Sequence, residues 1–350
     1  DEVHTVAGLV GGATMNFNFA NMFLLRDLWA TTPLRVICDA DLLYTASDSA
    51  PTSAVQDFMA ILDRGPVVCA KLTHTGPAHL RRSARLFYTH DKCPRNKRAW
   101  KGEIAAAAEA WHADHEQRFA VNVGSKAQMN EVVTLLRELR VPCKPYSGDT
   151  RKDSKDDLRD PDEAWVEFGA IVATTTLSIG VDPKRIRFAR VFAWTCRTGC
   201  SVLSQLQAAL RFGRSADAPL QNTTIDILVD CVPPAIRKLQ KRPLPVLPSY
   251  RDALKQLTEL RGARLRVELR GHAALGGAVA GIASAEPVCD KVLRLLVHSH
   301  SRLGLERRLQ ESDLHSTIVR ACRHHGWEVD DSVGASDPVD FDTTGLPAVE

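Results

Sequence analysis

The sequence predicts an α/β protein built on doubly wound parallel sheets, and three observations lead to this class. Short apolar runs alternate with longer amphipathic segments along most of the chain, which is the rhythm of strand–helix–strand units. An apolar run also opens directly into a Thr/Gly/Asp loop at 173–182. Finally, 350 residues that are 44% hydrophobic can form two cores. We therefore expect a partial first lobe, a complete second lobe and a C-terminal helical extension.

The first lobe is expected over residues 1–80. Aromatic and leucine spacing predicts a helix at 16–30, and Ser53 is a suitable N-cap for a helix that ends near residue 62. Short apolar runs at 35–38 and 67–70 predict buried strands between and after these helices.

The second lobe is expected over residues 81–235, where the same alternation repeats. Its expected helices are 104–116, 127–140 and 203–211, and its expected strands or extended runs are 119–123, 143–146, 165–172, 191–194 and 225–230.

A basic stretch from Arg81 to Lys101 stands at the start of this lobe, with eight Lys or Arg residues against one acid. Two interpretations remain open, a phosphate-binding surface and a solvated basic linker. On the first interpretation, Arg95, Lys97 and Arg98 are candidate DNA contacts. The net charge of +3 does not itself indicate a nucleic-acid partner.

Proline marks a linker at 236–249, after which helical patterns extend over 250–328. Residues 329–350 contain five aspartates, a glutamate and no Lys or Arg. This composition predicts a disordered acidic tail.

Nine cysteines without any CxxC pair indicate reduced thiols in the cytoplasm or nucleus. A group of histidines near Cys322 matches no common zinc spacing, which favours solvated histidines. No apolar run approaches the roughly 20 residues of a membrane span, so we expect a soluble protein with no membrane partner.

The stretch 207–214 contains Gln207 followed by Arg211 and Arg214. Arginines three apart on a helix project in the same direction, so the pair can neutralise charge on a transferring γ-phosphate. The chain begins with Asp1 and Glu2, residue types that bind magnesium and orient an attacking water in ATP hydrolysis.

Taken in order, Asp1-Glu2-Val3-His4, the 173–182 loop and the 207–214 stretch look like motifs II, V and VI of superfamily 2 helicases. The tract 165–176 together with these motifs resembles the herpesvirus-type replication origin-binding proteins, and the similarity covers residues 1 to about 230. The resemblance implies RecA-like lobes, ATP and Mg²⁺ as cofactors, and DNA and replication proteins as partners. It implies a DNA helicase that acts in replication.

The resemblance also implies residue roles. Asp1 would bind the magnesium ion, Glu2 would act as general base, and His4 would couple to motif VI, with Gln207 as the candidate partner. The loop that joins the ATP cleft to the DNA groove would contain Thr174, Gly180 and Asp182. The γ-phosphate contacts would be Arg211 and Arg214, and the DNA-backbone contacts would be Ser125 and Lys126.

The sequence departs from the family pattern at three places. Asp41 stands where motif III has Thr, and Leu210 replaces a glycine before the first motif VI arginine. A phosphate-binding G-x-x-x-x-G-K-[ST] loop does not occur in the sequence. We therefore expect the C-terminal part of a longer ATP-hydrolysing helicase, inactive by itself. The alternative is a catalytically inactive, helicase-derived DNA-binding or assembly module.

Overall fold

The computed structural model describes residues 83–89, 94–148, 156–174, 181, 183, 185–195, 201–212, 224–230, 252, 308, 310 and 313–330. The chain divides into two compact units, and the elements described below belong to the unit formed by residues 74–243 and 310–350. The helices and strands expected over 1–80, the linker at 236–249 and the helices expected between 250 and 299 lie outside the described residues, apart from residue 252.

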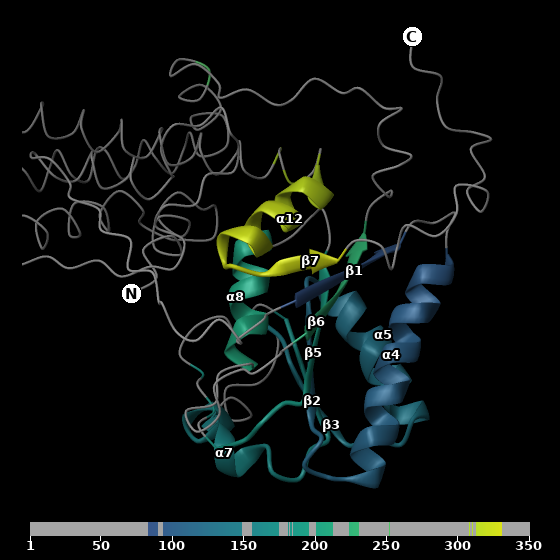
Figure 1. Cartoon of the computed structure of the whole chain (residues 1–350). Coiled ribbons are helices and arrows are strands. Elements are labelled where there is room, and N and C mark those ends of the chain that lie inside the picture. Colours follow the sequence, from purple (N-terminus) through teal and green to yellow (C-terminus); the bar gives the residue numbers. More distant parts are fainter. Residues whose placement is uncertain are drawn as a thin grey trace, which may run out of the picture. The chain divides into compact units, whose positions relative to one another are not determined.

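A seven-stranded sheet with the strand order β3-β4-β2-β5-β6-β1-β7 forms the centre of this unit (Figure 1). Every neighbouring pair of strands is parallel. The strands are β1 (Ser83–Thr89), β2 (Phe119–Val123), β3 (Cys143–Tyr146), β4 (Ala170–Ala173), β5 (Arg190–Thr195), β6 (Thr224–Asp230) and β7 (Glu328–Asp330). The helical segments are α4 (Pro94–Ala113), α5 (Lys126–Glu138), η1 (Asp156–Arg159), α7 (Pro161–Ala164), α8 (Val202–Phe212) and α12 (Leu314–His324).

Helices cover both faces of the sheet, with α4 and α5 on one side and α8 and α12 on the other (Figure 1). Side-chain alternation along the strands supplies both cores. Phe119, Val121 and Val123 of β2 belong to the core under α4 and α5. On the opposite face, the Tyr88 hydroxyl of β1 lies 2.7 Å from Nδ1 of His315 on α12. The doubly wound parallel α/β fold predicted from the sequence is confirmed.

Helix α5 shows how local sequence sets an element's bounds. Ser125 is extended (φ −147°), and its hydroxyl accepts a hydrogen bond from the Gln128 backbone N–H at 3.3 Å, which caps the helix. Met129, Val132 and Leu136 then repeat at helical spacing and are buried. The expected helix at 127–140 is thus confirmed within two residues at either end.

A close approach of α4 to the start of β4 requires a glycine. A Cβ atom added at Gly169 would lie 2.6 Å from Cε2 of Trp111, well inside van der Waals contact. The Gly169 amide also donates to the Pro142 carbonyl, and its carbonyl accepts from Phe119 N–H. Gly169 therefore lets the end of α4 pack onto the sheet.

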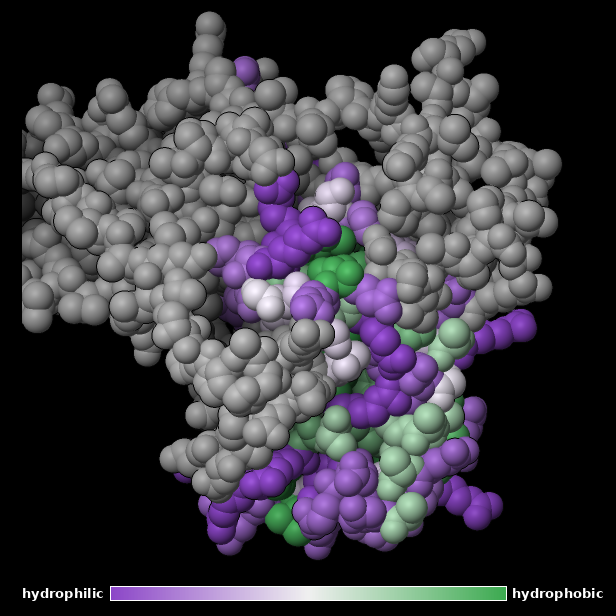
Figure 2. Space-filling view, in the orientation of Figure 1, coloured by the Kyte–Doolittle hydropathy of each residue, from purple (hydrophilic) through white to green (hydrophobic). Residues whose placement is uncertain are grey.

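The stretch 81–101 is not a solvated linker in its described part, because it contains β1 and the first turns of α4. Ala84, Leu86 and Tyr88 are almost fully buried. Helix α4 also begins at Pro94, ten residues before the helix expected at 104–116. Two charges of this stretch are compensated by residues distant in the sequence, Arg85 by Asp226 and Lys97 by Glu131. Outward from the sheet, hydrophobic residues lie among hydrophilic ones over α4 (Figure 2).

The C-terminal elements join the same sheet. Helix α12 falls within the helical region expected over 250–328, but β7 pairs with β1 in parallel, Ala84 opposite Val329. The expected boundary between extension and tail, at 328/329, therefore lies inside a strand. Gly326 has a φ of 75° and turns the chain from α12 into β7. An edge strand gains backbone pairing while its acidic side chains stay exposed, so composition alone does not indicate this strand.

Candidate nucleotide and nucleic-acid interface

The carboxyl ends of β2, β3 and β4 lie side by side, because the sheet order places β4 between the other two. The Thr174 N–H, directly after β4, donates to the Tyr146 carbonyl at the end of β3 at 2.9 Å. The Gly124 N–H, directly after β2, donates to the Trp194 carbonyl of β5 at 3.0 Å. Open α/β sheets bind ligands at this edge. The fold therefore brings three of the residues expected to face DNA to one edge: Ser125, Lys126 and Thr174.

The beginning of α5 has the geometry of an anion site. Ser125 is half-buried and its oxygen is engaged in the helix cap, whereas Lys126 is exposed as the first helical residue. The first turn of a helix carries partial positive charge and unpaired N–H groups. An ammonium group at that position adds a full charge, so this turn favours a phosphate.

The basic residues of α4 divide into two kinds. The ammonium group of Lys97 lies 2.8 Å from Oε1 of Glu131 and 4.5 Å from the centre of the Trp194 ring, and Lys101 lies 2.7 Å from the same carboxylate. Burial alone would raise the pKa of Glu131, but hydrogen bonds from Lys101 and Lys97 bring it below its ordinary value. Arg98 is exposed. Lys97 is thus largely used in holding α4 to α5.

Helix α8 carries two of the residues expected to form motif VI, Gln207 and Arg211. Gln207 is half-buried on α8, and Arg211 lies in its last turn; the backbone of Arg211 is described but its side chain is not. Phe212 fixes this end of the helix, because its ring lies 6.0 Å from that of Trp165 and 5.3 Å from that of Phe188. The backbone of Arg95 is described within α4, also without its side chain. The remaining predicted residues lie outside the described ranges: Asp1, Glu2, His4, Gly180, Asp182 and Arg214.

Asp162 is a positioning residue that sequence reasoning missed. Its Oδ1 atom accepts hydrogen bonds from the backbone N–H groups of Arg185 and Ile186, both at 2.8 Å. These residues follow the expected motif V loop at 173–182. Asp162 follows a proline at the start of α7, a pattern that in the sequence indicates only a helix N-terminus.

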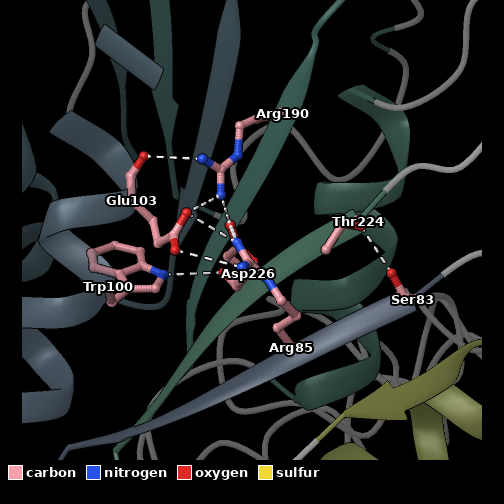
Figure 3. Close-up of polar contacts among 7 residues, drawn as sticks. All are labelled: Ser83, Arg85, Trp100, Glu103, Arg190, Thr224 and Asp226. Carbon is pink, nitrogen blue, oxygen red and sulfur yellow. Dashed lines mark hydrogen bonds and ion pairs between the residues drawn. The ribbon is translucent and has the colours of Figure 1, made fainter. Parts of the chain in front are cut away.

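A second polar group lies toward the amino half of the sheet, on the face of α4 (Figure 3). Asp226 of β6 has 2% of its side chain exposed. Its carboxylate accepts hydrogen bonds from Arg85 Nε at 2.6 Å, from Arg85 Nη2 at 2.8 Å and from Arg190 Nη2. Glu103 of α4 binds both arginines. The Trp100 indole N–H donates to the Asp226 carbonyl at 3.1 Å.

The ionisation of this network follows from its contacts. Hydrogen bonds to Asp226 raise the pKa of Arg85 further above its ordinary value, against the opposing effect of burial. Burial raises the pKa of Glu103, but hydrogen bonds from Arg190 and Arg85 lower it below its ordinary value. Two positive and two negative groups compensate one another, so the network joins β1, β5, β6 and α4 rather than binding a ligand.

Among the described residues, no group of three or more His, Cys, Asp or Glu side chains could hold a metal ion. In the same part of the chain, none of the helices is long and apolar enough to cross a membrane. The predicted magnesium site depends on Asp1, outside this part.

Comparison with protein-family models gave no match, and comparison with curated proteins also gave none. Among solved structures, the chain is similar to the C-terminal part of the Fun30 ATPase domain, at 16% identity and a TM-score of 0.31 over 42% of this chain and 48% of that one. It is also similar to the DUF1998 helicase MrfA bound to DNA, at 20% identity and a TM-score of 0.28 over 39% of this chain and 18% of MrfA. A third similar structure is the Mss116p DEAD-box helicase domain 2 bound to an RNA duplex, at 11% identity and a TM-score of 0.29, covering 53% of this chain and 78% of that one. The chain thus spans about half the length of the Fun30 part that it matches. At these values the assignment of function rests on the residues of this chain.

Proposed function

We propose that this chain carries the second motor lobe of an ATP-dependent superfamily 2 DNA helicase of the origin-binding type, which acts in DNA replication in the nucleus or cytoplasm. In this proposal, the described parallel sheet is the RecA-like second lobe. Its carboxyl edge faces the DNA backbone, and α8 presents motif VI toward ATP.

The observation that supports the proposal is the meeting of the ends of two strands at one edge of the sheet. Three residues that the helicase resemblance assigns to DNA, Ser125, Lys126 and Thr174, come from the ends of β2 and β4, which are adjacent in the sheet. They are separated by up to 49 positions in the sequence. Lys126 stands at the positive end of α5, which suits a backbone phosphate. Arg98 and Arg95 at the beginning of α4 would extend the same contact.

The ATP half of the proposal depends on the end of α8. Arg211 and Arg214 would neutralise charge on the γ-phosphate during transfer, with Gln207 linking this turn to His4. Asp1 would bind the magnesium ion of ATP, and Glu2 would orient the attacking water. Gly180 and Asp182 would belong to the loop that connects ATP to DNA.

A second candidate function is a catalytically inactive DNA-binding or assembly module. The specific observations that favour it are Asp41, where motif III has Thr, and Leu210 in place of glycine. This module would bind DNA through the same carboxyl edge without hydrolysing ATP.

Salt-dependent DNA binding tests the edge that both candidates share. We expect the affinity of this chain for a DNA duplex to fall with salt concentration, and Lys126→Ala to reduce the slope of log K against log salt by about one unit. Arg187→Ala is the matched control, because Arg187 is equally exposed but precedes β5 at the opposite edge. An affinity independent of salt, or an equal loss of slope in both variants, would contradict DNA binding at this edge.

A further inference from the structure

Residues 310–330 return to the second lobe after an excursion through the other unit. The chain leaves this unit at Pro243, and residues 244–309 belong to the other unit. The division between the two units falls directly before Gln310. Gln310 is thus the first residue of the returning segment that belongs to this unit, and the contacts of Gln310 and residues 313–330 described below lie within the unit.

The first of these contacts is with the beginning of α8. The Oε1 atom of Gln310 accepts a hydrogen bond from the backbone N–H of Val202 at 3.0 Å, in a buried position. Val202 is the first residue of α8, and the N–H groups of a first turn have no partner within the helix. Gln310 is itself only 5% exposed. A side chain more than 100 positions away in the sequence thus completes the cap that Ser201 begins through the Ser204 N–H.

Three further contacts fix the same segment against the sheet. Helix α12 packs on α8, with a buried stripe formed by Leu314, Ile318, Ala321 and Cys322. His315 is bonded to Tyr88 of β1 at 2.7 Å. After the turn at Gly326, β7 extends the sheet beside β1.

The opposite end of α8 bears Arg211. A rigid helix transmits a displacement of its first turn to its last one, which here lies seven to ten residues further along the chain. The ring of Phe212 anchors that last turn against Trp165 and Phe188, so the helix is held at both ends. Its beginning is held by Gln310, which belongs to the same unit as α8.

We infer that Gln310 and residues 313–330 form a clasp on α8, and that Gln310 is a positioning residue for the end of α8 that carries Arg211. The clasp by itself is independent of the proposed function; its effect on catalysis rests on the assignment of Arg211 and Arg214 to the γ-phosphate.

Hydrogen exchange of this chain tests the clasp. Gln310→Met keeps the length of the side chain but removes the acceptor, whereas Gln310→Glu keeps an acceptor oxygen. We expect exchange in α8 to become about tenfold faster in Gln310→Met, the effect of losing one buried hydrogen bond. Gln310→Glu should resemble the unsubstituted chain. Asp160→Ala, which removes the N-cap of α7, is the matched control and should leave α8 unchanged. Unaltered exchange in α8, or equally faster exchange throughout the sheet, would overturn the clasp.

ATP hydrolysis by the intact protein tests the positioning role. Because Arg211 and Arg214 would act on the phosphoryl group as it transfers, we expect Gln310→Met to lower kcat several-fold with KM for ATP unchanged. Gln310→Glu should keep kcat at the value of the unsubstituted protein. Faster exchange in α8 with an unchanged kcat would overturn the positioning role. If the unsubstituted intact protein hydrolyses no ATP, the proposed function fails, while the exchange result still decides the clasp.

Discussion

Removing the carboxylate of Asp226 is expected to destabilise the described unit strongly. This group has 2% of its side chain exposed and accepts three hydrogen bonds from two guanidinium groups, those of Arg85 and Arg190. Hydrogen bonds to charged groups contribute about 1.5–3 kcal/mol each, and breaking a buried ion pair by deleting one partner costs about 3–5 kcal/mol. The arginines retain 29% and 28% exposure, so water recovers part of the loss. We expect Asp226→Ala to lower the free energy of unfolding by about 3 kcal/mol.

Urea denaturation followed by tryptophan fluorescence measures this loss, because Trp100 packs in the same network and donates to the Asp226 carbonyl. Glu103→Gln is the control: Glu103 binds the same arginines but is 32% exposed, so its loss should be about 1 kcal/mol or less. A loss below about 1 kcal/mol for Asp226→Ala, or equal losses in the two variants, would refute the argument from burial.

Two further predictions concern packing and pH. Gly169→Ala should lower the melting temperature, because overpacking against the Trp111 ring costs about 1–3 kcal/mol. Gly102→Ala is the control and should stabilise the chain by about 0.5–1 kcal/mol, because nothing lies within 4 Å of the added Cβ. A lower melting temperature in both variants would contradict the packing argument. The lowered pKa of Glu131 means that its ion pairs stabilise the fold above its ordinary pKa of 4.5. This contribution is lost as the pH falls through the lower folded value, so Glu131→Gln should flatten the acid limb of the unfolding free energy measured between pH 7 and pH 3.

The sequence indicated the interior strands well, because strands buried on both faces are continuous apolar runs. The expected strand at 119–123 coincides with β2, and those at 191–194 and 225–230 fall within one residue of β5 and β6. These strands determine the sheet, so the fold class followed from local pattern alone.

Strand β1 could not be read in the same way. Its Arg85 lies in a strand because Asp226, 141 positions further along the chain, compensates its charge. The sequence did not predict strand β7 for a related reason, because an acidic edge strand depends on the strand that it pairs with. Long-range partners of this kind leave no local signal.

The sequence predicts only those residues of the candidate site that directly follow an apolar strand. Lys126 and Thr174 follow apolar strands, so their place at the carboxyl edge follows from parallel topology. The roles of Asp162 and Gln310 depend instead on contacts with backbone N–H groups 23 and 108 positions away. Such contacts become visible only in the folded chain.

DNA-stimulated ATP hydrolysis by the intact protein carrying Arg214→Ala is the measurement closest to the proposed function. We expect turnover to be abolished while the melting temperature stays unchanged, because the arginine acts on the transferring phosphate rather than on the core. Arg187→Ala should retain full turnover. Normal hydrolysis in Arg214→Ala would contradict the assignment of this chain to a helicase motor.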